Sequence, residues 1–141
     1  MTLDLSTALK IVQAALEAGR AENIVALSAV VTDTGGNIRA ALRADGVGMY
    51  GVDIAHAKAQ TSLGFNRSSM QLSKVFGANP SAVAALSGVT GGRFLPLGGG
   101  VLIRDAAGNI VGAAAVSGSS PENDERFIIA AIRANGLQVP D

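Results

Sequence analysis

Residues 24–43, with the sequence IVALSAVVTDTGGNIRAALR, decide the predicted fold. Residues 24–32 are a short, β-branched and almost entirely apolar run, which is typical of a buried strand. Residues 33–37 (DTGGN) carry the glycine and asparagine that tight turns require, and a second short run follows at 38–43. The stretch therefore predicts a β-hairpin.

A second hairpin is predicted further along the chain. Three glycines at 98–100 precede a short run at 101–104, a turn at 105–109 (DAAGN) and a longer apolar run at 110–116. Both turns share an Asp-x-x-Gly-Asn spacing. Because hairpins in general favour this turn motif, we give an internal duplication little weight.

Periodic and alanine-rich segments predict helices around these hairpins. Apolar residues recur at three- and four-residue steps between 5 and 19, with polar residues on the other side. The alanine-rich segment 52–65 predicts a second helix. Two shorter helical pieces are expected at 69–76 and 81–86, neither with a strong cap signal.

The last helix carries the clearest terminal signals. Ser120 is placed as its N-cap, Pro121 as its first residue, and Asn135-Gly136 as its C-terminal stop. The order of helices between and after hairpins favours an antiparallel sheet with helices packed on it. We therefore predict an α+β fold with a sheet of about five strands, in the order α-β-β-α-α-β-β-α.

Composition limits the class of protein. A chain of 141 residues fits a single domain, 1–141, and 11 basic residues balance 11 acidic ones. That balance argues against nucleic acid or a membrane as partners, and the absence of cysteine excludes thiolate chemistry. No signal-peptide pattern or long apolar run is visible, so we expect a cytoplasmic protein. Only 16% of residues are charged, which predicts apolar surface covered by a second copy in a homo-oligomer.

His56 is the first candidate for chemistry because it is the chain's single histidine. Any acid–base work near neutral pH or imidazole ligation of a metal would pass through it. Asp53 lies three residues earlier on the same predicted helix face, where it would orient the ring. Lys58 sits among small residues and would meet an anionic ligand group, although a solvated helix lysine is the simpler interpretation. For His56, the interpretation as a histidine that merely fills space is equally good.

Backbone and arginine groups supply further candidates for ligand binding. Gly98, Gly99 and Gly100 would let a ligand or another chain approach the backbone closely, although they lack the spacing of a dinucleotide fingerprint. Ser117 and Gly118 precede a helix start, where N–H groups bind anions, but capping is the more ordinary role. A third kind of candidate is an arginine near a predicted strand end that would pair with a carboxylate, as at Arg43.

Several of these segments carry a family resemblance. They are VDIAHAKA at 52–59, GGGVLIRD at 98–105, Gly112, and SGSSPEND at 117–124. With them the chain resembles the GlcG/HbpS family, also called the haem-degrading family, and the C-terminal domain of PduO-type corrinoid adenosyltransferases. The resemblance covers nearly the whole chain. It implies an antiparallel sheet flanked by helices, assembly into homo-oligomers and, in some members, haem or a corrinoid as ligand.

Three functions follow as hypotheses. The first is a tetrapyrrole-binding protein in which His56 is an axial ligand and Lys58 or Arg43 lies near the propionates. The second is a cofactor-free enzyme, of isomerase or lyase type, that moves a proton on a small carbonyl compound through His56 with Asp53 and Lys58. The third is a structural or chaperone-like oligomer without a ligand.

Overall fold

The computed structural model describes residues 3–140 and confirms the predicted α+β class. Within that range it contains five helices and four strands. In chain order these are α1 (Leu5–Arg20), β1 (Ser28–Thr32), β2 (Ile38–Arg43), α2 (Gly51–Phe65), α3 (Ser69–Phe76), α4 (Pro80–Val89), β3 (Gly100–Arg104), β4 (Ile110–Ser117) and α5 (Pro121–Ala134).

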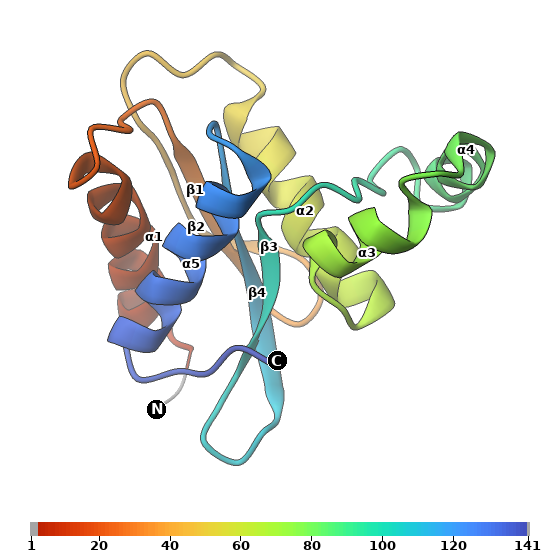
Figure 1. Cartoon of the computed structure of the whole chain (residues 1–141). Coiled ribbons are helices and arrows are strands. Elements are labelled where there is room, and N and C mark those ends of the chain that lie inside the picture. The colour runs from red at the N-terminus through yellow and green to blue at the C-terminus, as the bar shows by residue number, and fades with distance from the viewer. Residues whose placement is uncertain (1–2, 141) are drawn as a thin grey trace.

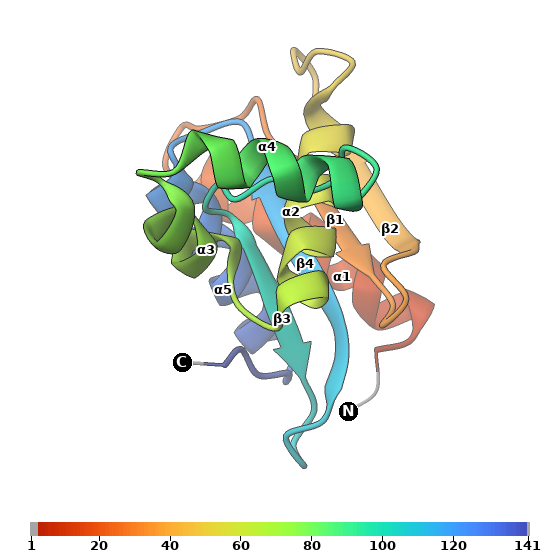
Figure 2. The same ribbon diagram turned by 90° about the vertical axis from the view of Figure 1, so that its right-hand side faces the viewer.

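One antiparallel sheet organises the molecule. Its strand order is β2-β1-β4-β3, so that the two predicted hairpins meet where β1 pairs with β4 in the centre. Helices α1 and α5 lie on one face of the sheet and α2 lies on the other (Figure 1). Helix α3 packs against α2 and β3, and α4 extends from α3 at the side of the molecule (Figure 2).

The two faces of the sheet are packed differently. Between the sheet and α1 and α5, the helices contribute large side chains, among them Ile11, Phe127 and Ile132. Between the sheet and α2, the core is built from Val30 and four buried alanines, Ala55 and Ala59 of the helix and Ala113 and Ala115 of β4. Because alanine side chains are small, α2 can pack close to the strands. No helix of the described residues is both long and apolar enough to cross a membrane.

Three details of the prediction differ from the structure. The sheet has four strands within residues 3–140 instead of about five. The predicted order counted two helices between the hairpins, although the three segments predicted as helical there, 52–65, 69–76 and 81–86, correspond to α2, α3 and α4. The first strand also begins at Ser28, although the apolar run starts at Ile24. The Ile24 N–H donates to the Gly19 carbonyl at 2.9 Å, so this part of the run closes the end of α1 instead of pairing in the sheet.

Cap signals for the middle helices were also missed. Ser68 and Gln71 form a reciprocal capping box at the start of α3. The Asn79 side chain accepts the Ala82 N–H at 3.1 Å, and Pro80 takes the first position of α4. At α5 the predicted N-cap is confirmed, because the Ser120 hydroxyl accepts the Asn123 N–H at 3.1 Å.

The two hairpin turns are built in the same way. In the first turn, Asp33 Oδ1 accepts the N–H groups of Gly35 and Asn37 at 2.9 and 3.0 Å. In the second, Asp105 makes the equivalent bonds to Ala107 and Asn109. These bonds stabilise the ionised carboxylate, so the backbone and side chain of Asn37 hold the Asp33 pKa below its ordinary value of 3.8.

This turn predicts a pH-dependent contribution to stability. A lowered carboxyl pKa stabilises the folded state above the unfolded pKa, and that stabilisation is lost as pH falls through the folded pKa. We expect Asp33→Ala to reduce the free energy of unfolding near neutral pH, and its difference from wild type to shrink below about pH 4. Urea unfolding across this range measures the effect, and Thr34→Ala, in the same turn, is the control. A difference for Asp33→Ala that does not vary with pH would contradict it.

Candidate functional site

His56 and Gln60 join α2 to the first hairpin turn. They are four residues apart on one face of the helix, and both side chains contact the Gly36 carbonyl. The distances are 2.7 Å from His56 Nε2 and 3.3 Å from Gln60 Nε2. Because a carbonyl oxygen only accepts, His56 donates through Nε2. In the neutral ring the lone pair is therefore on Nδ1.

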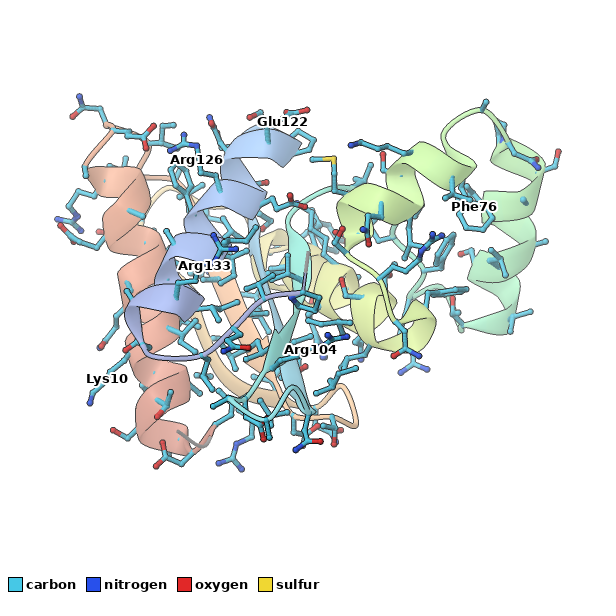
Figure 3. The ribbon with its side chains drawn as sticks, turned by 60° about the horizontal axis from the view of Figure 1, so that its bottom comes forward. Lys10, Phe76, Arg104, Glu122, Arg126 and Arg133 are labelled. Atoms are coloured by element: carbon cyan, nitrogen blue, oxygen red, sulfur yellow. The ribbon has the colours of Figure 1, made fainter. Side chains whose placement is uncertain are left out.

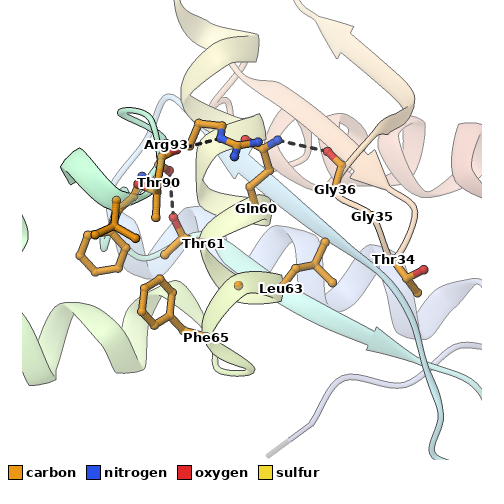
Figure 4. Close-up of a pocket in the computed structure, with 12 residues that line it drawn as sticks. Thr34, Gly35, Gly36, Gln60, Thr61, Leu63, Phe65, Thr90 and Arg93 are labelled. Carbon is orange, nitrogen blue, oxygen red and sulfur yellow. Dashed lines mark hydrogen bonds between the residues drawn. The ribbon is translucent and has the colours of Figure 1, made fainter. Parts of the chain in front are cut away.

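A pocket of about 370 Å³ opens beside this contact (Figure 4). Its walls come from the first hairpin turn, the C-terminal half of α2 and the segment that follows α4. Gln60 and Gly36 line it, which places His56 one helical turn before a wall residue. The apolar part of the lining includes Leu63, Phe65, Val89 and Phe94.

The aromatic wall of the pocket is held by ring packing and by one buried hydroxyl. The Phe65 and Phe94 rings are tilted by 51° with centroids 4.9 Å apart, and Phe76 meets Phe94 edge-on at 5.6 Å. The Thr61 hydroxyl donates to the Arg93 carbonyl at 3.2 Å and accepts the Leu95 N–H at 2.8 Å. This hydroxyl fixes the 93–95 segment against α2. It also leaves the exposed Arg93 side chain at the pocket, where its Nε donates to the Thr90 carbonyl.

Lys58 lies on a different side of α2 and is 4% exposed. Its ammonium donates to Asp124 Oδ2 and to the Val116 carbonyl, both at 3.1 Å. The other carboxylate oxygen of Asp124 accepts the Ser119 N–H at 2.9 Å. Burial raises the pKa of the Asp124 carboxyl, and the Lys58 charge opposes that rise. The pair therefore ties α2 to the end of β4 and the start of α5.

The glycine run packs directly on this ion pair. At Gly99, φ is +129° and a Cβ atom would stand 2.8 Å from Lys58 Nζ and 2.6 Å from the Val116 carbonyl oxygen. A Cβ on Gly100 would collide with the Lys58 backbone, and one on Gly98 with the Met70 side chain. The close backbone approach predicted for these glycines is thus made by the protein's own helices α2 and α3.

The remaining predicted residues lie at separate places. The Ser117 hydroxyl donates to the Gly51 carbonyl at 2.7 Å and is buried, and Gly118 takes a φ of +120° against the Ala26 carbonyl. Arg43 donates to the Val47 carbonyl at 2.6 Å in the loop before α2. Asp53 is exposed, and no hydrogen bond or ion pair joins it to His56.

Comparison with known proteins identifies the family. The model of the family described as haem degrading protein HbpS-like matches residues 3–133. The chain belongs to this family. None of the curated proteins is similar enough in sequence to count as a relative. The predicted resemblance is therefore confirmed by the family model.

Solved structures agree with this assignment to the HbpS-like family. HbpS, whose double mutant from Streptomyces reticuli is also among the matches, is 30% identical with a TM-score of 0.80, over 95% of this chain and 90% of that one. Klebsiella pneumoniae protein ORFY is 25% identical with a TM-score of 0.81, over 96% and 91%. The PduOC–haem complex is 22% identical with a TM-score of 0.86 over both whole chains, and at that identity shows the fold alone.

The structure of this HbpS-like chain sorts the predicted site residues into two groups. Lys58, the glycine run and Ser117 surround the contact between α2, β4 and α5, while His56 contacts the first hairpin turn beside the pocket without lining it. No cluster of three or more His, Asp or Glu side chains suited to a metal occurs among the described residues. Sequence reasoning missed Gln60, although its four-residue spacing from His56 was visible. It also missed Phe65 as a partner of Phe94, which no spacing could reveal.

The buried ion pair predicts strong coupling between its two members. Removing one member leaves the other charge buried without its partner, which costs about 3–5 kcal/mol. We therefore expect Lys58→Met and Asp124→Leu each to lower the free energy of unfolding by that amount. The double variant should lose much less than the sum, as measured by urea unfolding in a double-mutant cycle. Additive losses below about 1 kcal/mol each would contradict a buried pair.

Proposed function

We propose that this chain binds haem beside α2, where His56 would hold the iron through Nδ1 and the adjoining pocket would hold part of the ring. The contact between His56 Nε2 and the Gly36 carbonyl carries the proposal. Histidines that ligate metals almost always donate their other ring N–H to a carbonyl or carboxylate, which fixes the tautomer and the ring. The arrangement at His56 matches that requirement.

The composition of the pocket suits the same ligand. Its volume of about 370 Å³ falls in the range typical of small-molecule sites, about 300–1,000 Å³. Phe65, Phe94 and Val89 offer an apolar wall for a flat ring, and Arg93 offers a cation for a propionate. Because the chain has one histidine and no cysteine, His56 is also its single imidazole and it has no thiolate to compete.

Two of the comparisons support haem as the ligand. The family model carries the description haem degrading protein HbpS-like, and one structure of the same fold is a PduOC complex with haem. A corrinoid, the other ligand implied by the resemblance, would use the same imidazole. When bound, haem iron would supply redox and oxygen chemistry, while the protein would supply the ligand, the apolar wall and the propionate partner.

The enzyme hypothesis rests on residues that do not converge. His56 and Lys58 are two positions apart, so they project from different sides of α2. The Lys58 ammonium already bonds Asp124 and Val116, and no hydrogen bond or ion pair joins Asp53 to His56. Proton transfer by His56, Asp53 and Lys58 stays a prediction, and no hydrogen bond among these three residues supports it.

A haemin titration tests the proposed function. Wild type should give a saturable Soret shift, and His56→Ala should weaken haemin affinity at least about tenfold because the axial ligand is lost. Gln60→Ala is the comparison variant: it removes the other bond to Gly36 and alters the pocket wall but leaves the imidazole, so it should weaken affinity less than His56→Ala. Cobalamin in place of haemin tests the corrinoid. A wild-type protein without a Soret shift, or a His56→Ala variant of unchanged affinity, would refute haem ligation by His56.

We also propose that the chain forms a homo-oligomer through α3 and α4. None of the residues of α4 is buried, and an isolated ten-residue helix is marginal in water. An apolar groove of about 540 Å³ runs between α3, α4 and the 94–97 segment. Leu97 lines the groove and is exposed, and Val75 of α3 and Val89 of α4 are exposed on the two helices that form it. Because the chain has few charges, a second copy would cover this surface at little desolvation cost.

Light scattering tests this assembly. We expect a mass that is a multiple of 14.1 kDa at micromolar concentration. Leu97→Glu should shift the mass toward one chain, because it places a charge in the apolar groove. Val25→Glu is the control, since Val25 is similarly exposed, 58% against 48%, and does not line this groove. A wild-type mass of one chain, or equal effects of the two variants, would contradict the proposal.

A further inference from the structure

A second hollow lies away from the haem pocket, between α3, α5 and the outer edge of β3. Two adjoining cavities of about 570 and 390 Å³ share Met70, Lys74, Glu125 and Ile129. Arg104, at the end of β3, lines the smaller one together with the last described residues of the chain (Figure 3). Neither cavity includes a residue of the haem pocket.

The backbone of Leu102 is open toward the smaller cavity. β3 is an edge strand, and its outward N–H and C=O groups occur at every second residue. Those of Gly100 bond the Ser69 hydroxyl, and those of Arg104 bond the Gln138 backbone. Leu102 lies between them, and no hydrogen bond within the described chain occupies its outward groups. The cavity therefore presents one free donor and one free acceptor of the backbone.

Two buried side-chain atoms in the same lining have no partner. Arg104 Nε and Glu125 Oε2 are both buried and unbonded among residues 3–140. They do not form an ion pair with each other. Burial raises the pKa of the Glu125 carboxyl, and Lys74 opposes that rise. Because leaving a buried polar atom unpaired is energetically costly, their position in one cavity favours a ligand that bonds both.

The charge around the cavity favours an anion. Arg67, Lys74 and Arg104 contribute three positive charges to its lining, against the single acidic group of Glu125. Arginine pairs preferentially with carboxylates and phosphates. Glu125 and the Leu102 carbonyl, in contrast, need a hydrogen-bond donor. A ligand that suits the whole lining carries both kinds of group.

We propose that this cavity binds a small carboxylate that also bears a hydroxyl or an amine. The carboxylate accepts from Arg104 and from the Leu102 N–H. The hydroxyl or amine donates to Glu125 and to the Leu102 carbonyl. Since Gly100 and Arg104 are already bonded to Ser69 and Gln138, the free edge is one residue long, which suits a small molecule and excludes a longer peptide strand.

L-malate and succinate form a matched pair of probes for this site. Both carry two carboxylates, and malate alone has a hydroxyl. We expect calorimetric titration of the full chain to give saturable malate binding, with succinate weaker by at least about tenfold. The Leu102 amide should shift in the NMR spectrum on addition of malate. Arg104→Lys and Glu125→Gln should each weaken malate binding to a similar extent.

Two neighbouring residues supply the controls. Arg133→Lys and Glu122→Gln change residues of the same chemistry on α5 that line the larger cavity and not the smaller one. Both should leave malate affinity unchanged, and so should His56→Ala, because the haem pocket is separate. Absence of malate binding at millimolar concentration, equal binding of succinate, or malate binding that survives both Arg104→Lys and Glu125→Gln would overturn the proposal. Circular dichroism establishes that each variant is folded.

Discussion

The ion pair between Lys58 and Asp124 sets the position of α2, and the rest of the site depends on that position. The pair is almost fully buried, so it must stay closed to avoid a large desolvation penalty. It joins α2 to the Val116 carbonyl and to the first turn of α5. Side chains at the glycine run would not fit over it, which explains Gly99 and Gly100 by packing. The pair acts as a buried anchor between the two layers of the molecule.

Fixing one side of α2 also fixes what its other side presents. Two residues along a helix correspond to a rotation of about 200°, so His56 and Lys58 project in nearly opposite directions. With Lys58 held against β4, His56 and Gln60 meet the Gly36 carbonyl of the first turn. That contact sets the tautomer of the neutral ring and leaves a lone pair on Nδ1, the atom proposed to bind haem iron. One helix thus carries a structural residue, Lys58, and a proposed ligand, His56, within three positions. Their closeness in the sequence is why the sequence analysis assigned both to one site.

Local signals predicted most of the fold. Both hairpin turns, the Ser120 cap of α5 and the bounds of α3 follow from turn chemistry, capping and periodicity, which act over a few residues. The run that begins at Ile24 was misjudged because closure of α1 competes with sheet pairing for the same apolar residues. His56 was found because it is unique in composition. The structural role of Lys58 was not predicted, because its burial depends on the ion pair with Asp124, 66 residues later in the chain.

The two sides of α2 are proposed to have separate roles, with Lys58 structural and His56 ligand-binding. The measurement that separates these roles is the haemin affinity of the double variant Lys58→Met/Asp124→Leu, under conditions where circular dichroism shows it folded. We expect an affinity within about twofold of wild type, because the apolar pair preserves the anchor without charge. A loss as large as that of His56→Ala would contradict it and would place Lys58 at the ligand.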